Sequence, residues 1–300
     1  MKRFLKQLGK YLAIGYLIAS LVSFILDYSL THSRFYKFYL DGSEENLRNA
    51  ELLVFGGSRA LAGIDSQTLS KETGLKTYNV GVDDTGVASH LLLLKLLWKR
   101  GIRPRYIVLE YLNSEARPRW GWSTNDLRLL PLMLTDADVR TYIKQNQSAA
   151  FAYAHMALPF FKYSYYNEEL FFPALYTLAS KATAYRSDAY GDYSYPPDTT
   201  AEQGYYSTIS TDNLNTSCEE YREFVQFCLD KGVKIVTFVA PIEGKHLFTA
   251  DDSVVNFTYL DLPANNYYDS MHLNASGKEK VGKMLAAHLK LRLATSDTLN

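Results

Sequence analysis

Short apolar runs alternate with segments of helical periodicity in the first part of the chain. The runs at residues 51–55, 77–82 and 105–111 have the length of buried strands, and the leucine-rich residues 87–100 have helical spacing. A further helix is expected from about Ser66. Strands and helices that alternate within about sixty residues indicate parallel strands joined by right-handed crossovers.

The same pattern resumes towards the C-terminus. Residues 213–231 predict an amphipathic helix, residues 233–239 a strand and residues 257–260 a further strand. A closing helix is expected over residues 275–293, because its apolar positions recur on one face, as in a helix that packs on a sheet. These positions are Val281, Met284, Leu285 and Leu289. The predicted fold class is α/β, with a three-layer, flavodoxin-like parallel sheet.

Residues 112–210 interrupt this pattern with a long insertion rich in aromatic residues. Thr135, Asp136 and Asp138 have the residue types that cap a helix, so the insertion is expected to be helical in part. The two prolines at 196–197 indicate an extended linker. Aromatic rings with hydroxyl groups can stack on sugars, so a lid that faces a glycan is one interpretation. We favour the other, in which most rings pack the insertion against the sheet or the membrane interface.

The N-terminal segment combines positive charge with a long apolar run over residues 11–26. At about 16 to 20 residues, this run is longer than most signal-peptide cores and close to the minimum that spans a bilayer. The Lys and Arg residues before it predict a cytoplasmic N-terminus. They are Lys2, Arg3, Lys6 and Lys10. We expect residues 1–30 to form a basic stub and a transmembrane signal anchor, with residues 31–300 outside the cytoplasm.

Two alternatives remain for this N-terminal segment. One is a signal peptide that is cleaved, although no convincing small-x-small cleavage site follows the apolar run. The other is a buried core helix, which rarely starts with so much positive charge.

The charge and cysteine content exclude several classes of function. The chain has 32 Lys and Arg and 32 Asp and Glu residues, so no net field attracts nucleic acid, and no nucleic-acid partner is expected. Cys218 and Cys228 lie roughly 15 Å apart along one predicted helix, too far for a disulfide. The sequence has no His-Glu-x-x-His motif and no cluster of Cys and His, so we expect neither a metal nor a cofactor.

A candidate nucleophile stands after the first predicted strand. Ser58 follows Gly56 and Gly57 at the carboxyl end of that strand, the edge where open α/β sheets bind ligands. Glycines permit a sharp turn, and the amides of a following helix would face a developing anion. By itself, however, this sequence is more typical of an ordinary strand-to-helix turn.

Asp269 and His272 supply the groups that such a nucleophile needs. A serine requires a base that accepts its proton and a carboxylate that orients the base. The two residues lie three apart in the turn before the closing helix, so their side chains can face the same way. The other histidines have no such setting and are interpreted as structural: His32, His90, His155, His246 and His288.

Taken in order, these segments resemble the sequence blocks of the SGNH (GDSL-type) serine hydrolase superfamily. The matching blocks are a strand that ends in Gly-x-Ser, an Asn-x-Gly after the second strand, and an Asp-x-x-His followed by Leu-Asn-x-x-Gly before the last helix. The resemblance covers residues 51–111 and 213–293. Within the superfamily, the layout is similar to that of the membrane-tethered proteins of alginate and teichoic acid acylation.

The resemblance implies a role for each matching residue. Ser58 corresponds to the nucleophile, His272 to its base and Asp269 to the partner of that base. Gly81 corresponds to the glycine whose amide joins that of Ser58 in the oxyanion hole, and Asn79 would support this second turn.

Two positions depart from the family pattern. Gly57 stands where the family has the aspartate of Gly-Asp-Ser, and the third block, which carries an oxyanion asparagine, reads Glu-Tyr-Leu-Asn at residues 110–113. Asn113 is the candidate for that asparagine, and a solvent-facing loop residue is the alternative. A shortage of donors is typical of a slow enzyme, of a transferase completed by a partner, or of an inactive relative.

The resemblance implies a serine esterase or O-acyltransferase that acts on acyl esters of cell-envelope polysaccharide through an acyl-Ser58 intermediate. The implied setting is the bacterial cytoplasmic membrane, with a single N-terminal span and a periplasmic C-terminal domain. Envelope glycan would be the substrate, and a membrane acyltransferase a further partner. Two alternatives remain: a non-catalytic relative that binds glycan or scaffolds an export or modification complex, and a membrane-anchored α/β protein of unrelated activity.

Overall fold

The computed structural model describes residues 1–32, 45–112, 123–163, 168–179, 187–196 and 208–297. The chain divides into two compact units. The first comprises residues 1–41 and 126–185, and the second residues 42–125 and 186–300. The segment 112–210 is therefore shared between the units, and its residues from 186 onward belong with the sheet.

The second unit is built on a five-stranded sheet in which every pair of neighbouring strands is parallel. The strand order is β2-β1-β3-β5-β7, which is the doubly wound order 2-1-3-4-5 when these strands are numbered along the chain. The predicted parallel α/β sheet is thus confirmed. Its strands are β1 (Leu52–Phe55), β2 (Thr77–Asn79), β3 (Tyr106–Glu110), β5 (Lys234–Val239) and β7 (Val255–Asn256).

The last strand lies earlier than the sequence predicts. The expectation for residues 257–260 is wrong, because the chain turns directly after the short strand β7. The amide of Phe257 still donates to the Val239 carbonyl at 2.9 Å, and the amide of Leu260 then donates to the Phe257 carbonyl at 3.0 Å.

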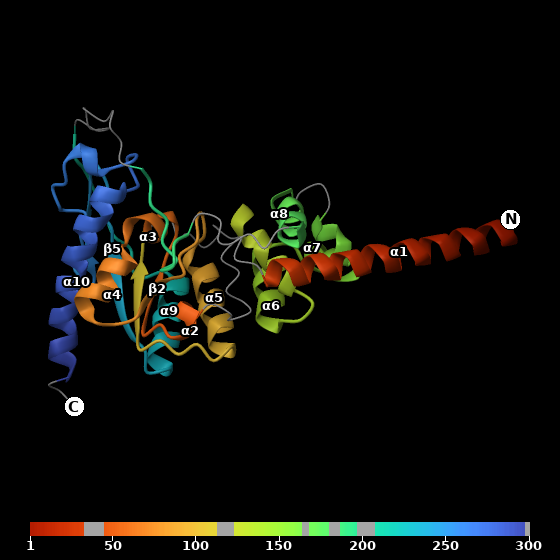
Figure 1. Ribbon diagram of the computed structural model, residues 1–300, viewed down its shortest axis with the longest axis horizontal. Coiled ribbons are helices and arrows are strands. Elements are labelled where there is room, and N and C mark those ends of the chain that lie inside the picture. Colours follow the sequence, from red (N-terminus) through yellow and green to blue (C-terminus); the bar gives the residue numbers. More distant parts are fainter. Residues whose placement is uncertain (33–44, 113–122, 164–167, 180–186, 197–207, 298–300) are drawn as a thin grey trace. The chain divides into compact units, whose positions relative to one another are not determined.

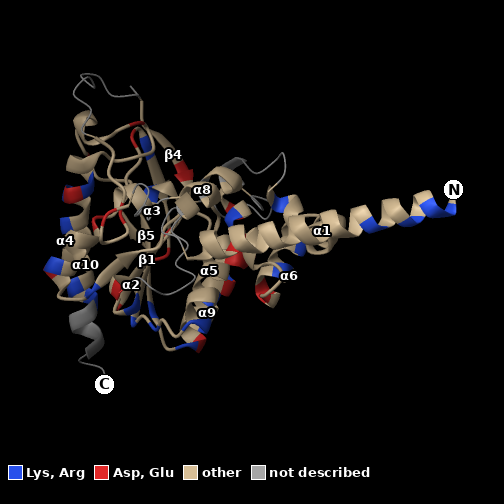
Figure 2. Cartoon of the chain, turned by 45° about the vertical axis from the view of Figure 1, so that its right-hand side comes forward, with Lys and Arg blue, Asp and Glu red and all other residues tan. Residues whose placement is uncertain are grey.

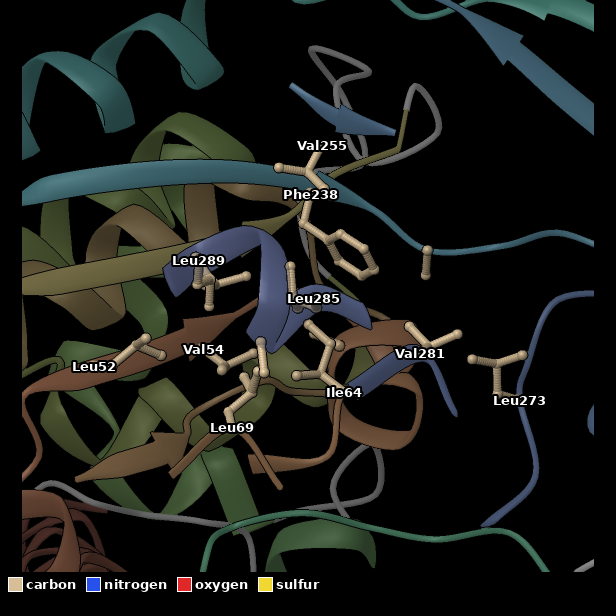
Figure 3. Packing of buried hydrophobic residues seen from close by; sticks show 14 of the residues in the cluster. Leu52, Val54, Ile64, Leu69, Phe238, Val255, Leu273, Val281, Leu285 and Leu289 are labelled. Atoms are coloured by element: carbon tan, nitrogen blue, oxygen red, sulfur yellow. The ribbon is translucent and has the colours of Figure 1, made fainter. Parts of the chain in front are cut away.

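Helices cover both faces of the sheet, because successive strand residues point to opposite faces and all of them are apolar in β1. On one face, Leu52 and Val54 pack against α3 (Ser58–Gly63), α4 (Ser66–Thr73) and α10 (Ala275–Asp297). Figure 3 shows this layer, with Leu69 of α4 and Leu285 of α10 over the strands. On the other face lie α5 (Val87–Lys99) and α9 (Glu219–Asp230), where Phe224 meets Phe55 with ring centroids 5.5 Å apart.

Smaller elements complete the second unit. The strands β4 and β6 form a separate parallel pair, which the sequence analysis did not predict. These elements are α2 (Glu45–Arg48), β4 (Ser210–Asn213), β6 (Lys245–Phe248) and η4 (Ala264–Asn266).

The first unit is helical. The helix α1 (Lys2–Thr31) is long and apolar enough to cross a membrane, and most of its apolar side chains are exposed, unlike those of a buried core helix. Its Lys and Arg residues gather at the N-terminal end (Figure 2). As expected, Asp136 caps a helix, accepting from the amides of Asp138 and Val139. The other elements are η2 (Thr124–Leu132), α6 (Ala137–Asn146), α7 (Ala149–Ala157), η3 (Pro159–Tyr163) and α8 (Glu168–Ala179).

Candidate active site

Ser58 stands where the chain turns sharply from β1 into α3. Gly56 has φ 145°, and a Cβ atom there would lie 2.9 Å from the Cβ of Glu110 and 2.6 Å from that of Ala60. Only glycine fits this turn, because a side chain would be strained in conformation and would overlap its neighbours. The turn places Ser58 at the first residue of α3, a helix that sequence periodicity did not predict before Ser66.

The three predicted triad residues are joined by hydrogen bonds. Ser58 Oγ lies 2.7 Å from His272 Nε2, although the two residues are 214 positions apart in the sequence. On the far side of the ring, His272 Nδ1 lies 2.9 Å and 2.8 Å from the two carboxylate oxygens of Asp269. A carboxylate at Nδ1 requires the proton on that nitrogen, which leaves Nε2 free to accept the Ser58 hydroxyl proton.

The Asp269 carboxylate is held by its own turn. Its Oδ1 accepts the amides of Met271 and His272, both at 2.8 Å. Partial burial alone would raise the pKa of Asp269, but the hydrogen bonds from the His272 ring and from these two amides bring the pKa below its ordinary value. Asp269 therefore carries a negative charge at neutral pH and orients the His272 ring.

Donors for a developing oxyanion are less complete. The Ser58 amide is in the first turn of α3, where amides have no intrahelical acceptor. The Gly81 amide donates to Asn79 Oδ1 at 2.8 Å, so an oxyanion would have to share or replace this acceptor. Asn79 thus supports the turn at Gly81. Asn113 lies outside the described residues.

A buried ion pair lies beneath the nucleophile turn, and the sequence analysis did not find it. Arg59 Nη2 lies 3.2 Å from Glu110 Oε1, and both side chains are buried. The same nitrogen donates to the carbonyl of Ala240, directly after β5, at 2.6 Å. Arg59 therefore connects the turn after β1 to the ends of β3 and β5. Burial raises the pKa of Glu110, and the positive charge of Arg59 opposes that rise.

A second buried carboxylate connects the elements around Asn79. Asp192 accepts the amide and the hydroxyl of Ser66 at 2.7 and 2.8 Å, and the side-chain amide of Asn79 at 2.9 Å. Lys278 Nζ lies 3.4 Å from the same carboxylate. Asn79 in turn donates to the Ala60 carbonyl at 2.8 Å, within the helix that begins at Ser58. Asp192 therefore fixes Asn79, which supports the turns at Ser58 and Gly81. The position of Asp192 in the predicted insertion gave no indication of this role.

Replacing Asp192 by asparagine should lower the free energy of unfolding by about 1–3 kcal/mol. The side-chain NH2 group of asparagine cannot accept the hydrogen bonds that Ser66 and Asn79 donate to the Asp192 carboxylate. Denaturant unfolding of the full chain in detergent, followed by tryptophan fluorescence, measures the difference. Asp261→Asn is the matched control, since Asp261 is exposed. Equal stability of the two variants would contradict the structural role of Asp192.

Wild type and Asp192→Asn should also differ in how their stability depends on pH. Burial raises the pKa of Asp192 from 3.8 to about 6, and Lys278 opposes the rise. The folded protein then binds this proton more tightly than the unfolded chain, so stability from Asp192 is greatest below its ordinary pKa and declines as pH rises through about 6. The stability gap between wild type and Asp192→Asn should therefore be wider at about pH 4 than at about pH 8.

Aromatic rings lie beside the triad. Tyr195 stacks on Tyr268, with ring centroids 4.1 Å apart and planes 10° apart, and its ring lies 5.5 Å from that of His272. Tyr268 is 40% exposed. Among the described residues, no group of three or more His, Cys, Asp or Glu side chains could hold a metal ion.

No family model matches the sequence, and no curated protein matches it.

Proposed function

We propose that this protein is a serine esterase or O-acyltransferase that acts on acyl esters of cell-envelope polysaccharide. The observation that carries the proposal is the continuous chain of hydrogen bonds from Ser58 Oγ through the His272 ring to the Asp269 carboxylate. This chain lies at the carboxyl ends of parallel strands, where doubly wound sheets place their ligands.

The reaction has two half-steps that share one base. Ser58 Oγ attacks the ester carbonyl while His272 Nε2 accepts the hydroxyl proton, and Asp269 stabilises the imidazolium that forms. The tetrahedral intermediate collapses as His272 returns the proton to the leaving sugar oxygen, which leaves an acyl-Ser58 ester. Water or a second sugar hydroxyl then loses its proton to His272 and attacks this ester. The bond between the acyl carbon and Ser58 Oγ breaks, His272 returns the proton to Ser58 Oγ, and the acyl group leaves as the free acid or as the new sugar ester.

The superfamily to which the chain is assigned and its cellular location are part of the same proposal. The strand order, the serine at the end of β1 and the Asp-x-x-His turn before α10 support assignment to the SGNH superfamily. The apolar helix α1 with its basic N-terminal end supports a single-pass protein of the bacterial cytoplasmic membrane, with the catalytic unit in the periplasm. Envelope glycan is the proposed substrate, and a membrane acyltransferase is a proposed further partner.

A second candidate function has its own support. The Gly81 amide already has an acceptor, and the partly exposed ring of Tyr268, stacked on the Tyr195 ring next to His272, suits a sugar ring. A non-catalytic glycan-binding or scaffold protein would keep both features.

Labelling with a fluorophosphonate probe distinguishes the two candidates, because such probes react with activated serines. The full chain in detergent should be labelled, and Ser58→Ala should abolish the label. Ser253→Ala is the matched control: the Ser253 hydroxyl donates to the Asp251 carboxylate, but this exposed pair has no histidine in its hydrogen bonds. An unlabelled wild type with an intact unfolding transition would favour the binding protein, and label retained in Ser58→Ala would disprove the assignment of the nucleophile.

A further inference from the structure

One face of α1 is polar, although the helix as a whole is apolar. Tyr16, Ser20, Ser23 and Asp27 recur at spacings of four, three and four residues, which places them on one side of a helix. Ser20, Ser23 and Asp27 are buried. The other sides carry exposed apolar residues, among them Leu17, Leu21, Phe24 and Tyr28.

The polar face is covered by the segments α7, η3 and α8, which together we call the collar (residues 149–163 and 168–179). The η3 and α8 segments pack along α1, and the first half of α1 extends beyond them (Figure 1). Tyr16 donates to the carbonyl of Ala157 at 2.9 Å, and Ser23 to that of Pro159 at 2.9 Å. On another side of α1, Ser29 donates to the Ala174 carbonyl of α8 at 3.2 Å.

These contacts satisfy the backbone where the collar changes direction. Ala157 ends α7 and Pro159 begins η3, so their carbonyls lie at a break between helices. Inside a bilayer, a backbone group at such a break needs a partner from the protein, because no water is present to supply one. The hydroxyl groups of α1 are those partners.

The charged groups of this interface are also paired. Asp27 accepts from Lys162 Nζ at 2.7 Å and from the Tyr163 hydroxyl at 2.6 Å. Lys162 is buried although it belongs to a surface segment. Charged residues at membrane depth pair with one another in this way and face the protein interior.

The length of α1 fixes the depth of the collar. A hydrocarbon core about 30 Å thick requires about 20 helical residues, so a span that begins after Lys10 ends near residue 30. The collar contacts run from Tyr16 to Ser29, within that interval. The part of α1 that the collar does not cover is only about 9 Å long from Lys10 to Tyr16, and about 18 Å long from Phe4 to Tyr16. Both lengths are shorter than the hydrocarbon core. If the collar lay in water, the remaining part of α1 would be too short to cross the bilayer.

We propose that the collar is embedded in the bilayer beside α1, as a re-entrant segment whose outer surface contacts lipid acyl chains. Its outward side chains fit that occupant, because six large apolar residues of the collar are exposed. The exposed apolar residues of the collar are Tyr153, Leu158, Phe172, Leu175, Tyr176 and Leu178.

The test uses the full-length protein in liposomes of phosphatidylcholine that carries a photoreactive diazirine in the acyl chain. After irradiation, mass spectrometry locates the lipid adducts. We expect adducts on the exposed side of α1 around Leu17 and also on the collar around Phe172 and Leu175, and none around Leu229. Leu229 is the matched control, an exposed leucine on α9 of the sheet unit. Adducts confined to α1, with the collar as free of lipid as Leu229, would overturn the proposal.

A second measurement does not depend on cross-linking yield. Leu175→Cys and Leu229→Cys are treated in intact liposomes with a membrane-impermeant maleimide, and each is compared with wild type, which carries the native Cys218 and Cys228. Leu229→Cys should gain a reactive thiol, whereas Leu175→Cys should show no gain. Equal gains in both variants would place the collar in water and overturn the proposal.

Discussion

Replacing His272 by alanine should slow acylation of Ser58 by about a hundred- to ten-thousand-fold, because a positioned base contributes that much to proton transfer. In the structure, the Ser58 hydroxyl lies 2.7 Å from His272 Nε2, so the variant removes the group that accepts its proton. The rate of reaction with the fluorophosphonate probe, or with an activated acetyl ester, measures the effect.

The matched control for this experiment is His246→Ala. His246 lies on β6, where its ring contacts that of Tyr259, and it takes no part in the triad. This variant should react at the wild-type rate. A His272→Ala protein that acylates as fast as wild type would show that the hydrogen bond does not activate Ser58, whatever its geometry.

Replacing Arg59 by methionine should lower the free energy of unfolding by about 3–5 kcal/mol, the range found when one partner of a buried ion pair is removed. Glu110 is completely buried, so its carboxylate would lose the charge that compensates its burial. The carbonyl of Ala240 would also lose the donor 2.6 Å away. Denaturant unfolding of the full chain in detergent measures the loss.

Two further variants separate the lost charge pair from lost packing. In Arg59→Met with Glu110→Leu, no charge remains buried, and much of the stability should return. Lys283→Met breaks the exposed pair with Glu279 on α10 and should change stability little. If the double variant were as unstable as Arg59→Met alone, the loss would come from packing and not from the unpaired carboxylate.

The parts of the fold that could be predicted from sequence are those determined by local patterns. The strands β1 and β3 are short apolar runs that are buried along their whole length, and β5 is buried over its last three residues. The helix α5 is a leucine-rich run of helical length, and in α10 the buried residues Val281, Leu285 and Leu289 recur every four positions. The short strand β7 has only two residues, too few for any period, and its position was predicted wrongly. The short helix α3 escaped prediction for the same reason.

The candidate triad could be singled out because each of its residues stands in a local sequence pattern. Asp269 and His272 lie in a single turn, and Ser58 follows an apolar strand and two glycines. The buried partners of the site have no such signal. Asp192 binds Ser66 from 126 positions away and Asn79 from 113 positions away, so only the folded chain brings them together.

The polar face of α1 shows another limit of the same kind. In the sequence, Ser20 and Ser23 are small residues that interrupt an apolar run, which is common in membrane spans. The role of this face can be recognised only from the segment that packs on it. Pro159, which accepts the hydrogen bond from Ser23, lies 136 positions further along the chain.

The distribution of the triad along the chain also orders events during biosynthesis. Ribosomes add His272 to the chain 214 residues after Ser58. The turn that holds Asp269 and His272 precedes α10, whose apolar face docks on the β1 layer of the sheet. A nascent chain that has not reached His272 therefore lacks the hydrogen bond to Ser58 Oγ. The full arrangement of Ser58, His272 and Asp269 forms only after residues 269–272 have been synthesised and α10 has docked on the sheet.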